Sequence, residues 1–289
     1  MPRLIVNADD FGMAPGVNRA ILELHAAEVL TSTTLMARAR ATEEAVNMAL
    51  AMPSLGVGCH VVLINGLPAS NPSSIPSLID RSTGTLYPSL GAFLKRLYTA
   101  RVRGAEIEIE VAAQIALLQS YGLRLTHIDT HKHLHMFPHV LRPVLRAARA
   151  AGIRMVRNPF EPLWSINATR YAPETRRAQV LLLGRLQSRF RRIVQDEGFL
   201  TTDGAIGVLA TGTLEISVVH SLISAMPEGT FEFVSHPGYR DEVLARANTR
   251  LLESREIERN ALVAIKGYSG IDLISFGDLQ QPASHRPVS

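Results

Sequence analysis

The feature that most constrains the fold is an alternation of strand-like and helix-like segments along almost the whole chain. Short apolar runs rich in β-branched residues predict strands at residues 4–7, 29–37, 56–64, 125–129, 153–157, 205–209, 230–235 and 271–275. Segments with apolar residues at helical spacing lie between them, at residues 15–27, 42–52, 105–121, 139–151, 173–196, 213–225 and 254–266. About seven to eight such alternations predict an α/β protein built on a parallel sheet.

Polar, reactive side chains recur where the predicted strands end. Asp9 and Asp10 follow the first strand, and His60 lies in the third. His131 follows the fourth strand and His236 follows the seventh. In a closed (β/α) barrel the C-terminal ends of all strands form one chemically active face, whereas an open sheet gathers its site at one switch point. We therefore expect a (β/α) barrel of about seven to eight strands.

Length and composition favour one globular domain. The chain has 289 residues, and no linker-like segment divides it, so we expect a single domain over residues 1–279 and a disordered tail over residues 280–289. Its only cysteine excludes an intrachain disulfide, and no apolar run reaches the length of a membrane helix, so a cytoplasmic protein is expected. The net charge of +4 is weak support for nucleic-acid binding, and no such partner is expected.

Residues 126–138 are unusually rich in imidazole. This stretch holds four of the ten histidines, His127, His131, His133 and His135, together with Asp129. Each buried imidazole needs partners for its ring nitrogens, so such a cluster is costly unless it serves a metal or a reaction. The row lies where a predicted strand passes into a predicted helix.

An aspartate and two histidines from separate strand ends form a mixed oxygen and nitrogen site for a catalytic metal. Asp10, His60 and His131 fit this pattern, which leaves coordination positions open for water. The neighbouring Asp9 could then take the proton of the attacking water, and His236 could donate one to a leaving group.

Simpler interpretations exist for each residue taken alone. The Asp9–Asp10 pair could form a turn or cap a helix, and His60 could be a satisfied interior histidine. His133 and His135 could support the ligands through hydrogen bonds, or line the pocket and bind substrate.

A strongly basic helix is predicted over residues 173–196. Its arginines run from Arg176 to Arg192, beside an apolar side that includes Phe190 and Ile193. Such a face is usually solvated, but an amphipathic helix of this kind can also lie on an anionic membrane.

Four motifs together resemble the YdjC-like carbohydrate deacetylases, a family that includes chitooligosaccharide deacetylase and a hopanoid-biosynthesis-associated deacetylase. The motifs are Asn-Ala-Asp-Asp-Phe-Gly at residues 7–12, Gly-Val-Gly-Cys-His at 56–60, the histidine-rich stretch at 126–138, and Ser-His-Pro-Gly-Tyr at 235–239. The resemblance implies a distorted (β/α) barrel of the glycoside hydrolase/deacetylase type. It also implies one divalent metal held by Asp10, His60 and His131, with Asp9 as catalytic base and His236 as general acid.

The expected activity is therefore metal-dependent removal of an N-acetyl group from an amino sugar. A soluble chitooligosaccharide and a lipid-linked sugar such as an acetylglucosaminyl hopanoid both suit the resemblance. Two imidazoles favour zinc, whereas the family is associated with magnesium. The resemblance to the family also implies a homodimer. The alternatives are a glycoside hydrolase, which needs two opposed carboxylates, and a non-catalytic sugar- or metal-binding protein.

Overall fold

A computed structural model describes residues 1–247 and 249–280 of the chain. The strands are β1 (Arg3–Phe11), β2 (Ser32–Leu35), β3 (Gly56–Val61), β4 (Ile79–Asp80), β5 (Thr85–Leu86), β6 (Ile128–Thr130), β7 (Gly204–Ile206), β8 (Thr230–Ser235) and β9 (Asp272–Leu273). Residues 281–289, which hold nearly all of the expected tail, lie outside the described part of the chain.

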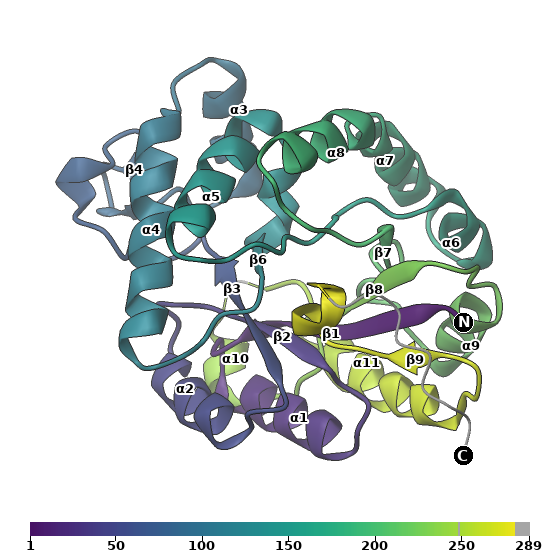
Figure 1. The fold of residues 1–289 in the computed structure, drawn as a ribbon. Helices are drawn as coiled ribbons and strands as arrows, with labels where there is room; N and C mark the ends of the chain where they lie inside the picture. The colour runs from purple at the N-terminus through teal and green to yellow at the C-terminus, as the bar shows by residue number, and fades with distance from the viewer. Residues whose placement is uncertain (248, 281–289) are drawn as a thin grey trace.

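The helices surround the strands on the outside of the molecule (Figure 1). They are α1 (Pro15–Ala26), α2 (Thr42–Ala51), α3 (Leu90–Tyr98), α4 (Gly104–Ser120), α5 (Pro138–Ala150), α6 (Leu163–Ala168), α7 (Glu174–Gly184), α8 (Gln187–Asp196), α9 (Ile216–Ser224), α10 (Glu242–Ala245) and α11 (Ser254–Leu262). Short 3-10 turns are η1 (Pro72–Ser74), η2 (His131–Met136), η3 (Val263–Gly267) and η4 (Phe276–Gln280). Among the described residues, no helix combines the length and apolarity that crossing a membrane requires.

Seven of the strands form one parallel sheet that curls into a distorted barrel. The order is β6-β3-β2-β1-β8-β7, and β9 pairs with the start of β1. Between β6 and β7 the ladder is reduced to single parallel bridges, Ile128 to Val156 and Met155 to Leu200. The predicted strand at residues 153–157 therefore contributes only these bridges. The expected α/β class and distorted barrel are confirmed.

The first strand extends beyond its predicted end. β1 continues through Asp9 and Asp10 to Phe11, whereas the predicted strand ended at residue 7. Its register against β2 shifts between Ala8 and Phe11, and Asp10 has φ 67°. An irregularity of this kind re-aims side chains, so both neighbouring carboxylates can reach the same end of the barrel.

The structure adds one feature to the predicted elements and corrects another. Residues 65–88, for which no strand or helix was predicted, contain the β4–β5 hairpin, and this segment is anchored where the backbone N–H groups of Ala69 and Ser70 donate to Glu110. The helix expected at residues 173–196 is broken into α7 and α8. The continuous arginine face predicted there does not form, because Arg176 and Arg177 donate to backbone carbonyls of the protein.

Candidate active site

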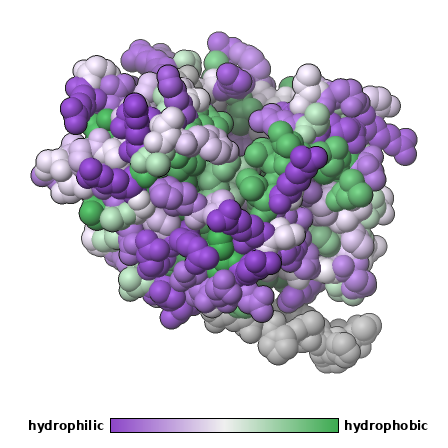
Figure 2. Space-filling model, turned by 90° about the horizontal axis from the view of Figure 1, so that it is seen from above, coloured by the Kyte–Doolittle hydropathy of each residue, from purple (hydrophilic) through white to green (hydrophobic). Residues whose placement is uncertain are grey.

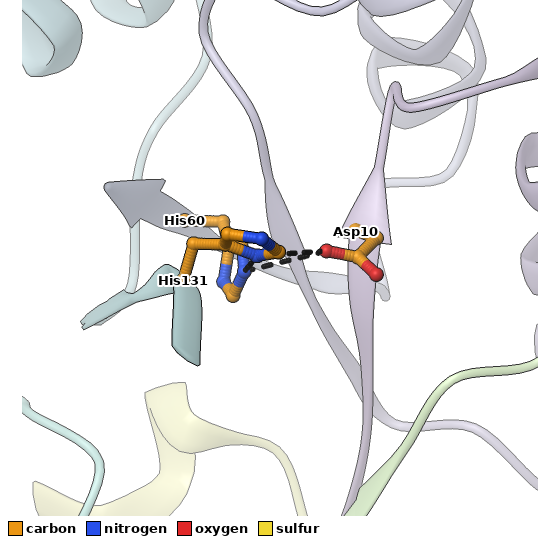
Figure 3. Close-up of side chains that lie close together, drawn as sticks. All are labelled: Asp10, His60 and His131. Carbon is orange, nitrogen blue, oxygen red and sulfur yellow. Dashed lines mark hydrogen bonds and ion pairs between the residues drawn. The ribbon is translucent and has the colours of Figure 1, made fainter. Parts of the chain in front are cut away.

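The three expected metal ligands meet at the C-terminal ends of their strands. Asp10 lies near the end of β1, His60 lies in β3, and His131 follows β6 directly. Asp10 Oδ1 is 3.5 Å from His60 Nε2 and 3.3 Å from His131 Nδ1, and the two ring nitrogens are 3.2 Å apart. In Figure 3 the three side chains point toward one another.

This donor set fits a divalent cation. Ligand atoms about 2.1 Å from a tetrahedral ion lie roughly 3.4 Å from one another, close to the three separations above. Oδ1 of Asp10 is buried without a hydrogen-bond partner among the described residues, whereas Oδ2 is held by Arg255 Nη2 at 2.5 Å. A buried carboxylate oxygen left unpaired is costly, and a cation beside it would remove that cost.

His60 is oriented by its other ring nitrogen. Nδ1 lies 2.8 Å from Asp129 Oδ1 and 3.1 Å from Thr34 Oγ1, which leaves Nε2 facing Asp10 and His131. Burial alone would lower the pKa of His60, but the negative charge of Asp129 and its neighbours raises it to about 9. The carboxylates around His60 therefore favour positive charge on this ring.

Asp9 lies in a buried ionic network and is not one of the three expected metal ligands. Arg157 contacts both of its oxygens, with Nη2 2.6 Å from Oδ1 and Nη1 2.8 Å from Oδ2. The same guanidinium binds Asp129 and lies 2.7 Å from Glu232 through Nε. Asp9, His60 and Asp129 also lie close enough together to resemble a metal site, but Arg157 already binds the two carboxylates there.

The network fixes the charge of Asp9. Burial alone would raise the pKa of this carboxyl, but Arg157, followed by His60 and His236, holds it well below its usual range. Asp9 is consequently an ionised carboxylate at neutral pH.

His236 faces Asp9 from the end of β8. Its Nε2 is 3.7 Å from Asp9 Oδ2, and its Nδ1 is 3.7 Å from Glu258 Oε2 on α11. Glu258 is held in place by backbone N–H groups of His236 and Gly212, at 2.7 and 2.9 Å. Burial alone would lower the pKa of His236, but Glu258 and Asp9 raise it.

Two further histidines of the histidine-rich stretch, His135 and His133, are placed differently. His135 is fully buried, with Nδ1 2.8 Å from Thr130 Oγ1 and Nε2 3.2 Å from the carbonyl oxygen of Arg157. Both of its ring nitrogens are thus engaged within the protein, Nδ1 with the Thr130 hydroxyl and Nε2 with the backbone of Arg157. His133 is half-buried in a left-handed conformation, φ 54°, and its Nδ1 has no hydrogen-bond partner among the described residues. Burial lowers the pKa of His133 to about 3, so its ring is neutral.

Sequence reasoning did not identify five residues of this region: Asp129 as a partner of His60, Arg157, Glu232, Arg255 and Glu258. Glu232 carried the clearest signal, because it lies in the middle of the apolar strand at residues 230–235. A buried acid in such a strand requires a cation or a proton.

Comparisons with known proteins place this chain in a family. The model of the YdjC-like protein family matches residues 3–264. A carbohydrate deacetylase of Geobacillus stearothermophilus is 34% identical over 282 residues, covering 96% of this chain and 98% of that protein. A carbohydrate deacetylase of Brevibacillus brevis is 32% identical over 283 residues, covering 96% and 99%.

A solved structure supports the same relationship. A protein from Enterococcus faecalis, whose name proposes a role in cellobiose-phosphate cleavage, superposes with a TM-score of 0.78 at 25% identity. The match covers 96% of this chain and 98% of that one. The chain belongs to the YdjC-like protein family.

Proposed function

We propose that this protein is a carbohydrate deacetylase that hydrolyses the N-acetyl group of an amino sugar with one divalent metal ion. The observation that carries the proposal is the unpaired Oδ1 of Asp10, which faces one ring nitrogen each of His60 and His131. The names of the relatives at 32–34% identity support the same reaction class.

The three ligands would hold the ion, and two imidazoles with one carboxylate suit zinc, with magnesium as the alternative. When bound, such an ion polarises the acetyl carbonyl and acidifies water, so that even a weak base suffices.

Asp9 is proposed as the catalytic base that takes the proton of the attacking water. Arg157 holds both oxygens, so the carboxylate cannot rotate away and stays ionised. Oδ2 of Asp9 accepts from Arg157 Nη1 and also faces Nε2 of His236. Asp9 therefore offers a fixed, negatively charged oxygen beside the ligands, although its depressed pKa makes it a weak base.

His236 is proposed as the general acid. Breaking the C–N bond requires a proton on the departing amine, and the raised pKa of His236 favours the ring form that carries one. The proton removed by Asp9 and the proton donated by His236 balance, and the products are acetate and the free amine.

The two alternative functions are less well supported. A glycoside hydrolase needs two carboxylates on opposite sides of the substrate, whereas Asp9 and Asp129 bind the same guanidinium of Arg157. A non-catalytic binding protein would not need an ionised carboxylate and a protonatable imidazole beside the ligand set. Acetate release separates these possibilities.

For the substrate, we propose a chitooligosaccharide or a lipid-linked amino sugar such as an acetylglucosaminyl hopanoid. One surface favours the lipid-linked choice: Leu163, Tyr171, Leu181 and Leu182 are 64, 91, 47 and 59% exposed. Figure 2 shows the molecule of Figure 1 from above, and hydrophobic residues gather on its right-hand side. In Figure 1, α6 and α7 lie on this side. Exposed arginines accompany them, including Arg170 and Arg189.

This surface also supports the proposal of peripheral membrane association by a cytoplasmic protein. Apolar side chains flanked by arginine suit an anionic bilayer. Co-sedimentation with phosphatidylglycerol vesicles at low salt should be reduced in a Leu181→Glu/Leu182→Glu variant. Absence of binding by the wild type would remove the membrane proposal and leave the deacetylase proposal intact.

A homodimer and a single domain over residues 1–279 remain proposals from the resemblance and from the uninterrupted βα alternation. Light scattering after gel filtration tests the first. The deacetylase proposal is tested by acetate release from a panel of free and lipid-linked N-acetylated sugars, with zinc or magnesium added.

A further inference from the structure

A second polar pocket lies away from the metal ligands, beside the β4–β5 hairpin. It has a volume of about 310 Å³, and its lining includes Ser77, Arg81, Arg96, Ala100, Arg101 and Arg103. These residues come from the β4–β5 excursion, the C-terminal end of α3 and the start of α4. None of them belongs to the site around Asp10.

The charges around this pocket are unbalanced. Arg103 pairs with Glu106, with Nη1 3.3 Å from Oε1. Within residues 1–247 and 249–280, Arg81, Arg96 and Arg101 make no ion pair with a carboxylate. Three guanidinium groups that share a pocket without counter-charge repel one another, so an anion bound between them would be stabilised.

Arg96 is the most constrained of the four arginines. Its guanidinium lies over the Tyr87 ring, with Cζ 4.8 Å from the ring centroid. Its Nε is buried and has no hydrogen-bond partner among the residues that the structure describes. A buried N–H that remains unpaired is costly, and Arg96 also lines the pocket.

The backbone around the pocket brings the arginines together. Ala100 adopts a left-handed conformation, φ 55°, and the N–H of Arg101 donates to the carbonyl of Arg96 at 2.9 Å. This turn brings the backbone of Arg101 back to that of Arg96, and both residues line the pocket. Arg103 occupies the N-cap position of α4, where no side chain caps the helix, so the positive end of a 17-residue helix dipole adds to the field.

We infer that this arginine pocket binds a multiply charged oxyanion, a phosphate group of a small molecule or of a lipid headgroup. Guanidinium groups bind phosphate through paired N–H donors, and several converging on one cavity give a site for more than one negative charge. The inference does not rest on the deacetylase activity, since it concerns different residues and a different ligand.

Isothermal titration of the full-length protein with inorganic phosphate, and separately with glucose 6-phosphate, tests the inference. We expect saturable one-to-one binding that an Arg96→Gln/Arg101→Gln variant weakens by about tenfold or more, the scale of losing charge-assisted hydrogen bonds. An Arg124→Gln variant is the matched control, because Arg124 is exposed and lies outside the pocket. Its affinity should equal that of the wild type.

An Asp10→Asn variant separates this pocket from the metal ligands. If phosphate binding is lost in Asp10→Asn and retained in the double arginine variant, the anion binds at the metal centre and the inference is wrong. Absence of saturable binding by the wild type, or equal affinity in the wild type and the double variant, also overturns it. Vesicles with phosphatidic acid, whose phosphate monoester can carry two negative charges, or with phosphatidylcholine alone identify the source: a headgroup ligand requires that the double arginine variant, but not Arg124→Gln, bind the phosphatidic acid vesicles more weakly than the wild type.

Discussion

Arg157 forms a two-point ion pair with Asp9, with Nη2 2.6 Å from Oδ1 and Nη1 2.8 Å from Oδ2, and both side chains are buried. The pair joins residues 148 positions apart in the chain. It links the proposed base to Asp129, the carboxylate that orients His60. The geometry of the proposed base and of one proposed metal ligand therefore depends on the same guanidinium.

Replacing Arg157 by Met should destabilise the fold strongly. It leaves Asp9, Asp129 and Glu232 buried without their shared cation, and breaking a buried ion pair from one side costs about 3–5 kcal/mol. Urea unfolding at pH 7 measures the change in the free energy of unfolding. Arg157→Lys keeps the charge but cannot make the same set of contacts, so it should fall between wild type and Arg157→Met. A loss below about 1 kcal/mol in Arg157→Met would contradict the role of the network.

The same ion pair predicts how stability depends on pH. Because the folded pKa of Asp9 lies below its usual value of 3.8, its contribution is fully present above that value. The contribution is lost as the pH falls through the depressed folded pKa. In Arg157→Met the carboxyl no longer has this partner, so lowering the pH from 7 to 5 should recover part of the lost stability. Urea unfolding of both proteins at the two pH values measures this, and a parallel loss in both proteins would be inconsistent with it.

Asp9→Asn should separate catalysis from metal binding. Removing a catalytic base lowers kcat by about 10²–10⁴-fold, whereas Asp10, His60 and His131 are unchanged. We expect unaltered metal content by mass spectrometry and a large loss of acetate release. Full activity on a substrate that the wild type deacetylates would exclude Asp9 as the base.

Glu258→Gln should change the pH profile through His236. Glu258 raises the pKa of His236, so neutralising it lowers that pKa. If His236 acts as the acid, the limb of the kcat profile that falls as pH rises should move to lower pH. An unchanged limb, in a variant that folds and retains its metal, would mean that His236 is not the group that titrates.

Gly58→Ala tests the packing behind His60. A Cβ at this position would lie 2.6 Å from the His127 ring, which is itself stacked on Phe276 with ring centroids 3.8 Å apart. Overpacking of this kind costs about 1–3 kcal/mol, measurable by urea unfolding. Gly91→Ala is the matched control, because a Cβ there meets no atom within 4 Å, and its effect should stay within about 1 kcal/mol of zero.

The sequence predicted the parallel βα architecture well, because buried parallel strands read as short apolar runs. The run at residues 230–235 became β8 with the same bounds. The helix at residues 173–196 was predicted as continuous, because helical spacing continues across Gly184. The inward turn of Arg176 depends on tertiary contacts with carbonyls of Val208 and Thr211. Such contacts leave no periodic signal.

The proposed ligands were readable from the sequence because each follows or lies in a predicted strand, and parallel strand ends share one edge. The role of Arg157 could not be predicted from the sequence, because its partners Asp9, Asp129 and Glu232 are 148, 28 and 75 positions away. Arg255 on α11 is likewise 245 positions from Asp10. Pairing across such distances is fixed by the closure of the barrel, which a single sequence does not show.

The most direct test is metal stoichiometry by equilibrium dialysis with zinc, followed by mass spectrometry, for the wild type, His131→Ala and Asp9→Asn. We expect one tightly bound ion per chain in the wild type and in Asp9→Asn, and loss of that ion in a folded His131→Ala variant. Equal zinc content in His131→Ala and the wild type would contradict a metal centre built from Asp10, His60 and His131.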